Sequence, residues 1–413
     1  MSDSTHGDVL IAPLPRITMQ AFCETPDVAA AIQAASEDRR MHKAHVKVQM
    51  GGAPAAVEAY RQAPTPNVIV LESLGERSGL LGHLDTLSEV CDSGTKVVVV
   101  GHVNDVILYR ELVRRGVSEY IIAPVSVLDV VKSISELFSA PGAEPVGRTI
   151  AVVGAKGGVG ASTVAHNLSW ATARQLSLST VVVDLDIAFG TAGLDFNQDP
   201  PQGIAEAIFA PERLDANLVD RLLSKCSDNL SLLAAPATLD RTTDLVETAL
   251  DGLFDILRAS VPCIILDVPH LWTAWVRRTL IGSDEIVIVA APDLASLRNT
   301  KNLFDSLRQA RPNDRRPKIL LNQVGVPKRP EIAAGDYAKA LGTEIFSSLS
   351  FDAQLFGTAA NNGQMIAEVQ PGGKITEAFA ELAAAMTGRM EPKRAKANLL
   401  EPILARLARR KAS

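Results

Sequence analysis

Short apolar runs alternate with amphipathic segments from about residue 17 to residue 138. The runs are rich in β-branched residues and read ITMQAFCE, HVKVQM, PNVIVLES, TKVVVVGH and EYIIAP. Between them, segments such as VAAAIQAASEDRR and DVILYRELVRRG repeat apolar residues at helical spacing. Strands that alternate with helices form a parallel sheet with helices on its faces. The pattern therefore predicts an α/β domain over residues 17–138.

A second alternating series follows a short segment of different composition. This segment, SAPGAEPVGR at residues 139–148, concentrates proline, glycine and small residues and is typical of a linker. The runs beyond it are apolar almost throughout and read TIAVVGA, TVVVDLD, LSLLAAP, CIILDVP, EIVIVAAP, KILLNQV and EIFSSLS. Such runs suit strands buried on both faces of a doubly wound, mostly parallel sheet. We predict a larger α/β domain over residues 149–388.

The two ends of the chain lack this alternation. Residues 1–16 mix polar residues with two prolines and predict a flexible lead-in. Residues 389–413 are rich in Lys and Arg. Within them, the apolar positions that recur at helical spacing are Leu399, Leu400, Ile403, Leu404 and Leu407. A basic amphipathic helix of this kind can lie on an anionic membrane or dock in a partner's groove. The alternatives are a terminal helix packed on its own domain and a solubilising tail.

Composition changes this picture little. A chain of 413 residues exceeds one ordinary hydrophobic core, which agrees with two domains. Charged residues make up 21% of the chain and the formal net charge is -6, so nothing in the bulk charge indicates a nucleic-acid partner. We expect neither a signal peptide nor a membrane-spanning run, so any membrane association is peripheral. The cysteines lack the spacing of a zinc site or redox pair and fit a reducing cytoplasm. They are Cys23, Cys91, Cys226 and Cys263.

The glycine-rich stretch AVVGAKGGVGAST lies between a predicted strand and the predicted helix STVAHNLSWATARQL. A phosphate-binding loop requires this context. Gly157, Gly158 and Gly160 permit positive φ angles and a close approach to oxygen atoms, and the amides that open the helix offer unpaired donors. Ser162 stands where a hydroxyl group binds Mg²⁺, but Ala161 occupies the position of the usual lysine.

The stretch AKGGVGAST resembles the deviant Walker A motif, KGGxGK[ST], of the ParA/MinD ATPases. In that family the early lysine, matched here by Lys156, reaches across an ATP-sandwiched dimer to the partner's nucleotide. The resemblance implies a P-loop NTPase fold, ATP and Mg²⁺ as cofactors, and a homodimer in which Lys156 has a catalytic role. It also implies nucleotide contacts from the loop residues Gly157, Gly158, Val159, Gly160, Ala161, Ser162 and Thr163.

Three further segments are similar to this family. VVVDLDIAFG resembles its switch I strand, which places Asp184 near the metal and Asp186 near the attacking water. CIILDVP resembles its Walker B strand and makes Asp267 a partner of Mg²⁺, partly through water, while LLNQ presents Asn322 where an amide recognises adenine. Carboxylates at strand ends can orient Mg²⁺ and a nucleophile, and an asparagine amide matches an adenine edge. Singly, each residue could be a cap or turn residue; their order favours nucleotide binding.

The alanine at position 161 is a departure from the family's loop. Without a lysine there, the loop lacks a positive charge beside the β- and γ-phosphates, which weakens binding, slows hydrolysis, or both. In a dimer, Lys156 of one subunit can compensate. We therefore expect a domain that binds ATP·Mg²⁺ and dimerises but hydrolyses ATP slowly or only with a partner.

The first domain resembles a response-regulator receiver domain that has lost its phosphorylation residues. VIVLES gives Glu72 in place of the acceptor aspartate, and IIAP gives Ala123 in place of the lysine before proline. The segment CETPD also lacks the paired acids that follow the first strand. This domain is expected to serve binding or localisation. An ordinary exposed carboxylate is one interpretation of Glu72, and a mimic of the phosphorylated residue is the alternative.

A degenerate receiver joined to a deviant Walker ATPase resembles the CpaE/TadZ family of type IV (Flp/tight-adherence) pilus assembly, over about residues 17–388. That family often replaces the lysine of the loop. The resemblance implies a cytoplasmic, polar localisation factor that helps recruit the secretion ATPase and other pilus machinery. Two alternatives stay open: a partition or placement ATPase acting on DNA or a division or flagellar complex, and a non-enzymatic scaffold with a vestigial nucleotide site.

Overall fold

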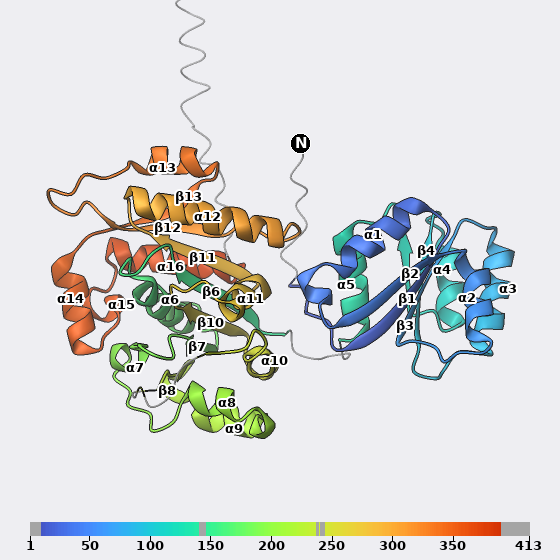
Figure 1. Cartoon of the computed structure of the whole chain (residues 1–413), viewed down its shortest axis with the longest axis horizontal. Helices are drawn as coiled ribbons and strands as arrows, with labels where there is room; N and C mark the ends of the chain where they lie inside the picture. The colour runs from blue at the N-terminus through green and yellow to red at the C-terminus, as the bar shows by residue number, and fades with distance from the viewer. Residues whose placement is uncertain (1–9, 140–145, 237–238, 240–243, 390–413) are drawn as a thin grey trace, which may run out of the picture.

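The computed structural model describes residues 10–139, 146–236, 239 and 244–389, and these form two α/β domains, each built on its own sheet (Figure 1). The predicted amphipathic helix of the tail lies outside the described residues, as does most of the predicted linker. Among the described residues, we find no helix with the length and apolar character needed to cross a bilayer.

The first domain contains a parallel sheet of five strands in the order β2-β1-β3-β4-β5. Its strands are β1 (Ile17–Cys23), β2 (Ala44–Met50), β3 (Val68–Ser73), β4 (Lys96–Gly101) and β5 (Glu119–Ile122). Its helices are α1 (Pro26–Ser36), α2 (Gly52–Tyr60), α3 (Arg77–Ser88), α4 (Val106–Arg114) and α5 (Val127–Leu137). Helices α1 and α5 cover one face, and α2, α3 and α4 cover the other, which gives a separate apolar core on each side.

The second domain contains a sheet of eight strands in the order β13-β12-β11-β6-β10-β7-β9-β8. All neighbouring pairs are parallel except β8 and β9. The strands are β6 (Arg148–Gly154), β7 (Thr180–Asp184), β8 (Ser224–Ser227), β9 (Leu230–Leu233), β10 (Cys263–Val268), β11 (Glu285–Ala290), β12 (Lys318–Val324) and β13 (Ile345–Ser350). The doubly wound, mostly parallel sheet predicted from the apolar runs is thus confirmed.

Helices cover both faces of the second sheet. One face carries α6 (Ala161–Gln175), α14 (Ala353–Asn362), α15 (Ile366–Val369) and α16 (Lys374–Met386). The other face carries α8 (Ile204–Phe209), α9 (Ala216–Leu222), α10 (Asp251–Ser260), α11 (Ala274–Gly282), α12 (Leu294–Ala310) and α13 (Ala334–Leu341). The short helix α7 (Ala192–Asp195) follows β7. Because the central strands are buried on both faces, their sequences are apolar almost throughout.

Three local details differ from the sequence-based expectations. The helix predicted through EDRR ends at Ser36, and the 3₁₀ turn η1 (Arg39–Met41) follows it after Asp38 caps the turn. Strand β8 was missed because its sequence, SKCS, is short and polar. The end of the predicted flexible lead-in is packed: Leu14 is buried and its amide donates to the carbonyl of Arg40.

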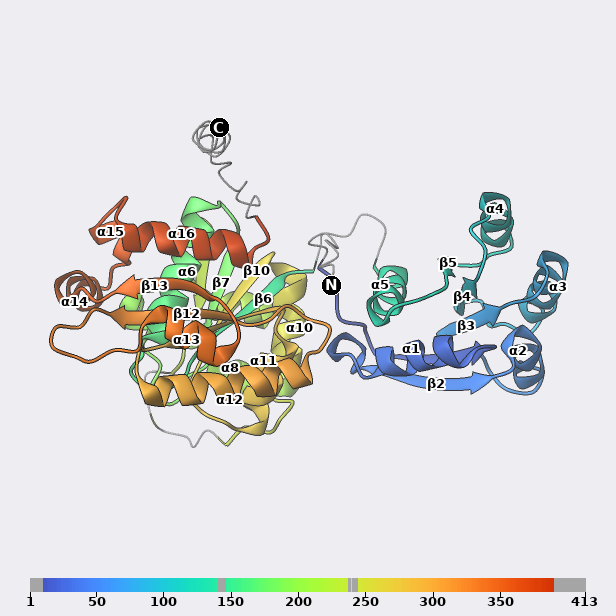
Figure 2. The same ribbon diagram turned by 90° about the horizontal axis from the view of Figure 1, so that it is seen from above.

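A buried ion-pair cluster joins the two domains, which lie side by side in Figure 2. Arg39 donates from Nε to Asp314 at 2.8 Å and from Nη2 to Asp284 at 3.1 Å, and all three side chains are at most 6% exposed. Burial alone would raise the pKa of Asp284, but the guanidinium groups of Arg258 and Arg39 hold it well below its usual range. Separating the domains would remove both of these carboxylate partners from Arg39, so the cluster opposes their separation.

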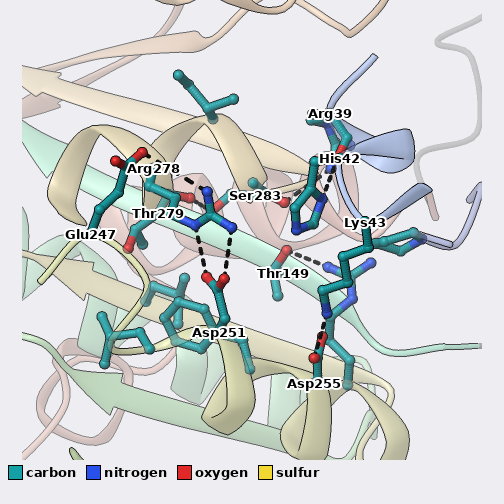
Figure 3. A pocket seen from close by; sticks show the side chains of 17 residues that line it. Arg39, His42, Lys43, Thr149, Glu247, Asp251, Asp255, Arg278, Thr279 and Ser283 are labelled. Atoms are coloured by element: carbon teal, nitrogen blue, oxygen red, sulfur yellow. Dashed lines mark hydrogen bonds and ion pairs between the residues drawn. The ribbon is translucent and has the colours of Figure 1, made fainter. Parts of the chain in front are cut away.

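A cavity of about 160 Å³ lies beside this cluster, between the two domains (Figure 3). Figure 3 shows that charged side chains around it pair with one another: Arg278 contacts Asp251, and Lys43 of the first domain contacts Asp255. Of these two pairs, Lys43–Asp255 extends the contact between the domains, whereas Arg278–Asp251 lies within the second domain.

The interface lies at the amino ends of the strands of the second sheet. Asp284 immediately precedes β11, and its carboxylate accepts hydrogen bonds from the amide and hydroxyl groups of Thr149 in β6. Ligands of open α/β sheets bind at the carboxyl ends of the strands. The first domain therefore docks at the edge opposite the one where a nucleotide site is expected.

Candidate nucleotide site

The glycine-rich loop leaves the carboxyl end of β6 and opens α6, as the sequence predicted. Gly158 and Gly160 have φ angles of +77° and +84°, a region that favours glycine. A Cβ atom on Gly160 would lie 2.6 Å from Nδ2 of Asn322, so a side chain there would collide with the end of β12. Gly157 and Gly158 are exposed, with no atom within 4 Å of a Cβ built on either. The loop thus presents open backbone to a ligand.

Side chains at the end of β12 hold this loop. Asn322 donates from Nδ2 to the carbonyl of Val159 at 2.8 Å, and Gln323 donates from Nε2 to the carbonyl of Gly158 at 2.9 Å. Asn322 is 5% exposed, and its amide donor is directed at the loop. The role of Asn322 in adenine recognition stays a prediction. Gln323 was not singled out in the sequence.

The first turn of α6 contains the position of the missing lysine. Ala161, Ser162 and Thr163 are all half-buried. The methyl group of Ala161 packs against the apolar cluster beneath α6, so position 161 contributes packing and no charge. The amides of a first helical turn have no intrahelical partners, and they form the positive end of the helix dipole. Ser162 therefore stands at a helix end whose charge suits an anion, and its Mg²⁺ contact stays a prediction.

Lys156 is paired within its own chain. Its Nζ lies 2.6 Å from Oδ2 of Asp293, and the lysine side chain is 37% exposed. Asp293 is the N-cap of α12, where its other oxygen accepts the amide of Ser296. Burial opposes ionisation of Asp293, but the ammonium of Lys156 and the amide of Ser296 lower its pKa. No sequence motif marks Asp293, because it lies far from the loop along the chain.

Asp184 and Asp267 are adjacent at the ends of neighbouring parallel strands, where they are paired in register. They are 1% and 3% exposed. Burial and the carboxylate of Asp267 together raise the pKa of Asp184 to about 7. Asp184 accepts the amides of Asp186 and Ala192. Two buried carboxylates side by side are costly unless a cation compensates them, so the pair suits Mg²⁺.

Asp186 begins the loop that follows β7. Its Oδ1 accepts the amide of Phe189 at 3.1 Å, and it is only half-buried. The structure therefore places Asp186 beside Asp184 but in a more open position. Its predicted role near the attacking water stays a prediction.

His166, on α6, is a member of this cluster that the sequence did not reveal. It is fully buried, with Nδ1 2.7 Å from Oδ2 of Asp195 and Nε2 3.4 Å from Oδ2 of Asp267. Burial would lower the pKa of His166, but the two carboxylates raise it to about 10, which makes the ring a cation. A single histidine within a helical pattern carries no sequence signal for such a role.

These residues fit a nucleotide with Mg²⁺. Open glycine backbone and the first amides of α6 suit phosphate oxygens, and the carboxylates at the ends of β7 and β10 suit a hard cation. Within the described ranges there is no group of three or more His, Cys, Asp or Glu residues arranged to hold a metal ion by themselves. Mg²⁺ commonly binds through one or two carboxylates together with substrate phosphates, and the carboxylates of Asp184 and Asp267 agree with this mode of binding.

The acceptor position of the receiver-like domain is not an exposed carboxylate. Glu72 is fully buried and accepts hydrogen bonds from the amides of Glu24 and Thr25, the hydroxyl of Thr25, and His102. Burial opposes its ionisation, but these hydrogen bonds lower the pKa of Glu72. The expectation of an ordinary exposed side chain was wrong, because the start of α1 closes over the end of β3. Ala123 precedes a cis proline.

Comparisons relate both domains to known proteins. A family model described as an AAA domain matches residues 147–319. A crystal structure of the pilus assembly protein CpaE from Caulobacter crescentus is 48% identical and covers 32% of this chain and 99% of its own, with a TM-score of 0.31. A ParA family ATPase from Chlorobium tepidum is 25% identical and covers 58% of this chain and 98% of its own, with a TM-score of 0.52. The septum site-determining protein MinD of Bacillus subtilis is 22% identical over 262 residues, which are 60% of this chain and 91% of that protein.

The matches divide between the two domains. The CpaE structure corresponds to the first domain, whereas the AAA family model corresponds to the second. Sequence identity over nearly all of the solved CpaE chain identifies the family of the first domain. The likeness to the ParA family ATPase identifies the type of the second. The resemblances found in the sequence are thus confirmed for both domains.

Proposed function

Because the chain belongs to the CpaE family of pilus assembly proteins and its second domain is of the ParA/MinD ATPase type, we propose that it binds ATP with Mg²⁺ and dimerises on the bound nucleotide. The dimer would act as an assembly and localisation factor for a type IV (Flp/Tad) pilus or a related secretion apparatus. A ligand that binds the dimer better than the monomer shifts the equilibrium toward the dimer, which then presents a surface that the monomer lacks.

Each residue of the site has a role in this proposal. The backbone of residues 157–160 cradles the phosphates, and Ser162 binds Mg²⁺ together with Asp267 and Asp184, partly through water. Asp186 positions the attacking water. Bound Mg²⁺ would neutralise charge on the phosphates. Hydrolysis is slow or depends on a partner, because Ala161 supplies no charge where the loop usually carries a lysine.

Lys156 carries the proposal. It is a partly exposed cation at the start of a loop whose usual lysine position is Ala161, and its partner Asp293 lies at the surface rather than in the core. An ion pair of this exposure contributes little to stability, so Lys156 can exchange Asp293 for a phosphate of a second subunit at small cost. The essential positive charge is thereby supplied from position 156 rather than 161.

The test is the mass of the purified full chain in solution with and without ATP·Mg²⁺. We expect a dimer that forms with ATP·Mg²⁺ and is lost in Lys156→Ala. Lys301→Ala is a matched control, because Lys301 is an exposed lysine of the same domain whose ion pair is with Asp305 in the next turn of α12. If the solution mass of the wild-type chain is the same with and without ATP·Mg²⁺, the nucleotide switch is contradicted and the scaffold alternative is favoured.

Partners and location follow from the same proposal. The dimer would recruit pilus machinery, including a secretion ATPase, from the cytoplasm at a cell pole. The basic tail at residues 389–413 would provide peripheral membrane contact. Flotation with anionic vesicles, comparing the full chain with a chain that ends at residue 388, tests the membrane contact. Salt-sensitive binding of DNA would instead favour a partition or placement ATPase.

A further inference from the structure

The segment after β7 is attached to the candidate metal site at both ends of α7. At its start, the amide of Ala192 donates to Oδ2 of Asp184 at 3.1 Å. At its end, Oδ2 of Asp195 lies 2.7 Å from Nδ1 of His166. Helix α7 is therefore hydrogen-bonded directly to the carboxylate of Asp184. It is also linked, through His166, to the carboxylate of Asp267.

His166 lies between two carboxylates on different elements. Its Nε2 is 3.4 Å from Oδ2 of Asp267, at the end of β10, while Nδ1 contacts Asp195. The ring is fully buried and packs against Phe196, with 5.4 Å between the ring centroids. Since both ring nitrogens face carboxylate oxygens, both must carry a hydrogen.

The two contacts are unequal. The contact to Asp195 is a short hydrogen bond, whereas Nε2 reaches Asp267 only at ion-pair distance and has no hydrogen bond of good geometry within the described part of the chain. A buried donor without a hydrogen bond is costly, so small shifts of Asp267 change the energy of this contact. Of the two contacts of His166, the one to Asp267 is therefore the more sensitive to changes at the metal site.

The segment that His166 holds presents large apolar side chains to solvent. Phe189, in the loop before α7, is 74% exposed, and Leu194, within α7, is 73% exposed. The loop is bonded to the site as well, because the amide of Phe189 donates to Asp186. Both exposed side chains therefore lie on the segment that is hydrogen-bonded to Asp184 and Asp186.

We propose that His166 is a positioning residue that couples Asp267 to α7, so that occupation of the nucleotide site moves the segment that exposes Phe189 and Leu194. This inference rests on the proposed binding of ATP·Mg²⁺. A shift of Asp267 would be passed through His166 to Asp195 and so to α7, which carries the exposed Leu194. His166 itself does not touch the nucleotide.

Three substitutions of His166 separate coupling from simple anchoring. His166→Asn places an amide near the position of Nδ1 and keeps a donor for Asp195, but it cannot reach Asp267. His166→Gln places an amide near the position of Nε2 and keeps a donor for Asp267, but it loses Asp195. His166→Phe keeps a ring and removes both donors. Because the first two variants each retain one contact, they guard against a variant that fails to fold.

The measurement is amide hydrogen exchange of the full chain with and without ATP·Mg²⁺. In the wild type we expect ATP·Mg²⁺ to slow exchange both in the glycine-rich loop and in residues 186–198. In all three variants the loop should still respond, while the slowing of exchange in residues 186–198 should be lost.

The outcomes separate this inference from the proposed function. If the wild-type loop does not respond to ATP·Mg²⁺, the proposed function and the coupling both fail. If the loop responds and residues 186–198 do not, the coupling alone fails. If His166→Asn keeps the full response of residues 186–198, then His166 merely anchors α7 through Asp195, and the coupling is overturned.

Discussion

The ammonium nitrogen of Lys156 lies 2.6 Å from a carboxylate oxygen of Asp293 in the same chain. Lys156, which is proposed to reach a second subunit, is therefore already paired within its own subunit. Any contact that it makes across a dimer must first replace this ion pair. The pair holds the lysine near its own loop and sets a small cost on dimer formation.

Removing the charge of Asp293 should favour the dimer. Asp293→Asn keeps an oxygen that can accept the amide of Ser296 and cap α12, but it releases Lys156. A partly exposed pair is worth about 0.2–1 kcal/mol, so the ATP concentration at half-maximal dimerisation should fall up to about fivefold. Solution mass measured over an ATP titration provides the test. An unchanged or higher midpoint would show that the pair does not compete with dimerisation.

Restoring the missing lysine should strengthen the site. Ala161→Lys places a positive charge in the first turn of α6, where phosphate charge is expected. We expect ATP turnover to rise at least about tenfold, because one added electrostatic contact at a reacting phosphate is worth that much or more. Ala161→Met is the matched control, since it adds a comparable length without charge. Equal rates in the two variants would mean that the charge at position 161 is not what limits hydrolysis.

The sequence predicts those parts of the fold and site that depend on local pattern. The strands before Asp184 and Asp267 are apolar throughout, and parallel strands bring their carboxyl ends to one edge, so these two residues could be placed together in advance. Asp293, Gln323 and His166 could not, because their partners lie far away in sequence and no motif marks them. Each is set by how the chain packs around the loop.

The interface between the domains was hidden for a related reason. Arg39 lies in EDRR, a charged run that resembles the end of a solvated helix. Its partners Asp284 and Asp314 precede strands of the other domain, where charged residues are common. Only the docking of the domains shows that these charges are buried.

The stability of the nucleotide-free protein should fall as the pH rises from about 4 to 7 because of Asp184. Its pKa is raised to about 7, against about 3.9 in an unfolded chain, so in this range the folded state holds a proton that the unfolded state has released. A tenfold change in proton affinity is worth about 1.4 kcal/mol, which allows roughly 4 kcal/mol for the full effect above pH 7.

Asp184→Asn tests this dependence. The variant has no proton to lose, so it never buries a charge at this position. It gives up one of the two amides that Asp184 accepts, so its net gain in stability over the wild type should be about 2 kcal/mol above pH 7. Near pH 4 the wild-type protein no longer bears the cost of the raised pKa. Only the lost amide contact then remains, so the variant should be about 2 kcal/mol less stable than the wild type. Urea unfolding at pH 4 and pH 8 without nucleotide measures both differences. Asp228→Asn, at an exposed position, is the control. A gain that is the same at both pH values would contradict the raised pKa.

Arg39→Ala should uncouple the two domains. Breaking a buried ion pair costs about 3–5 kcal/mol, and we expect roughly 3 kcal/mol here, because Asp284 keeps Arg258 and Asp314 keeps Arg40. The control is Arg61→Ala, whose pair with Glu58 is exposed and worth less than about 1 kcal/mol.

The positions of the tryptophans allow the uncoupling of the two domains to be measured. The chain's three tryptophans all lie in the second domain, so their fluorescence follows only that domain, whereas far-ultraviolet circular dichroism follows both. With the domains coupled, the two signals should change together in urea. In Arg39→Ala the circular dichroism should begin to change at lower urea than the fluorescence, since the first domain no longer shares the stability of the second. Signals that still coincide at the wild-type midpoint would show that the domains are held together by contacts other than the Arg39 cluster.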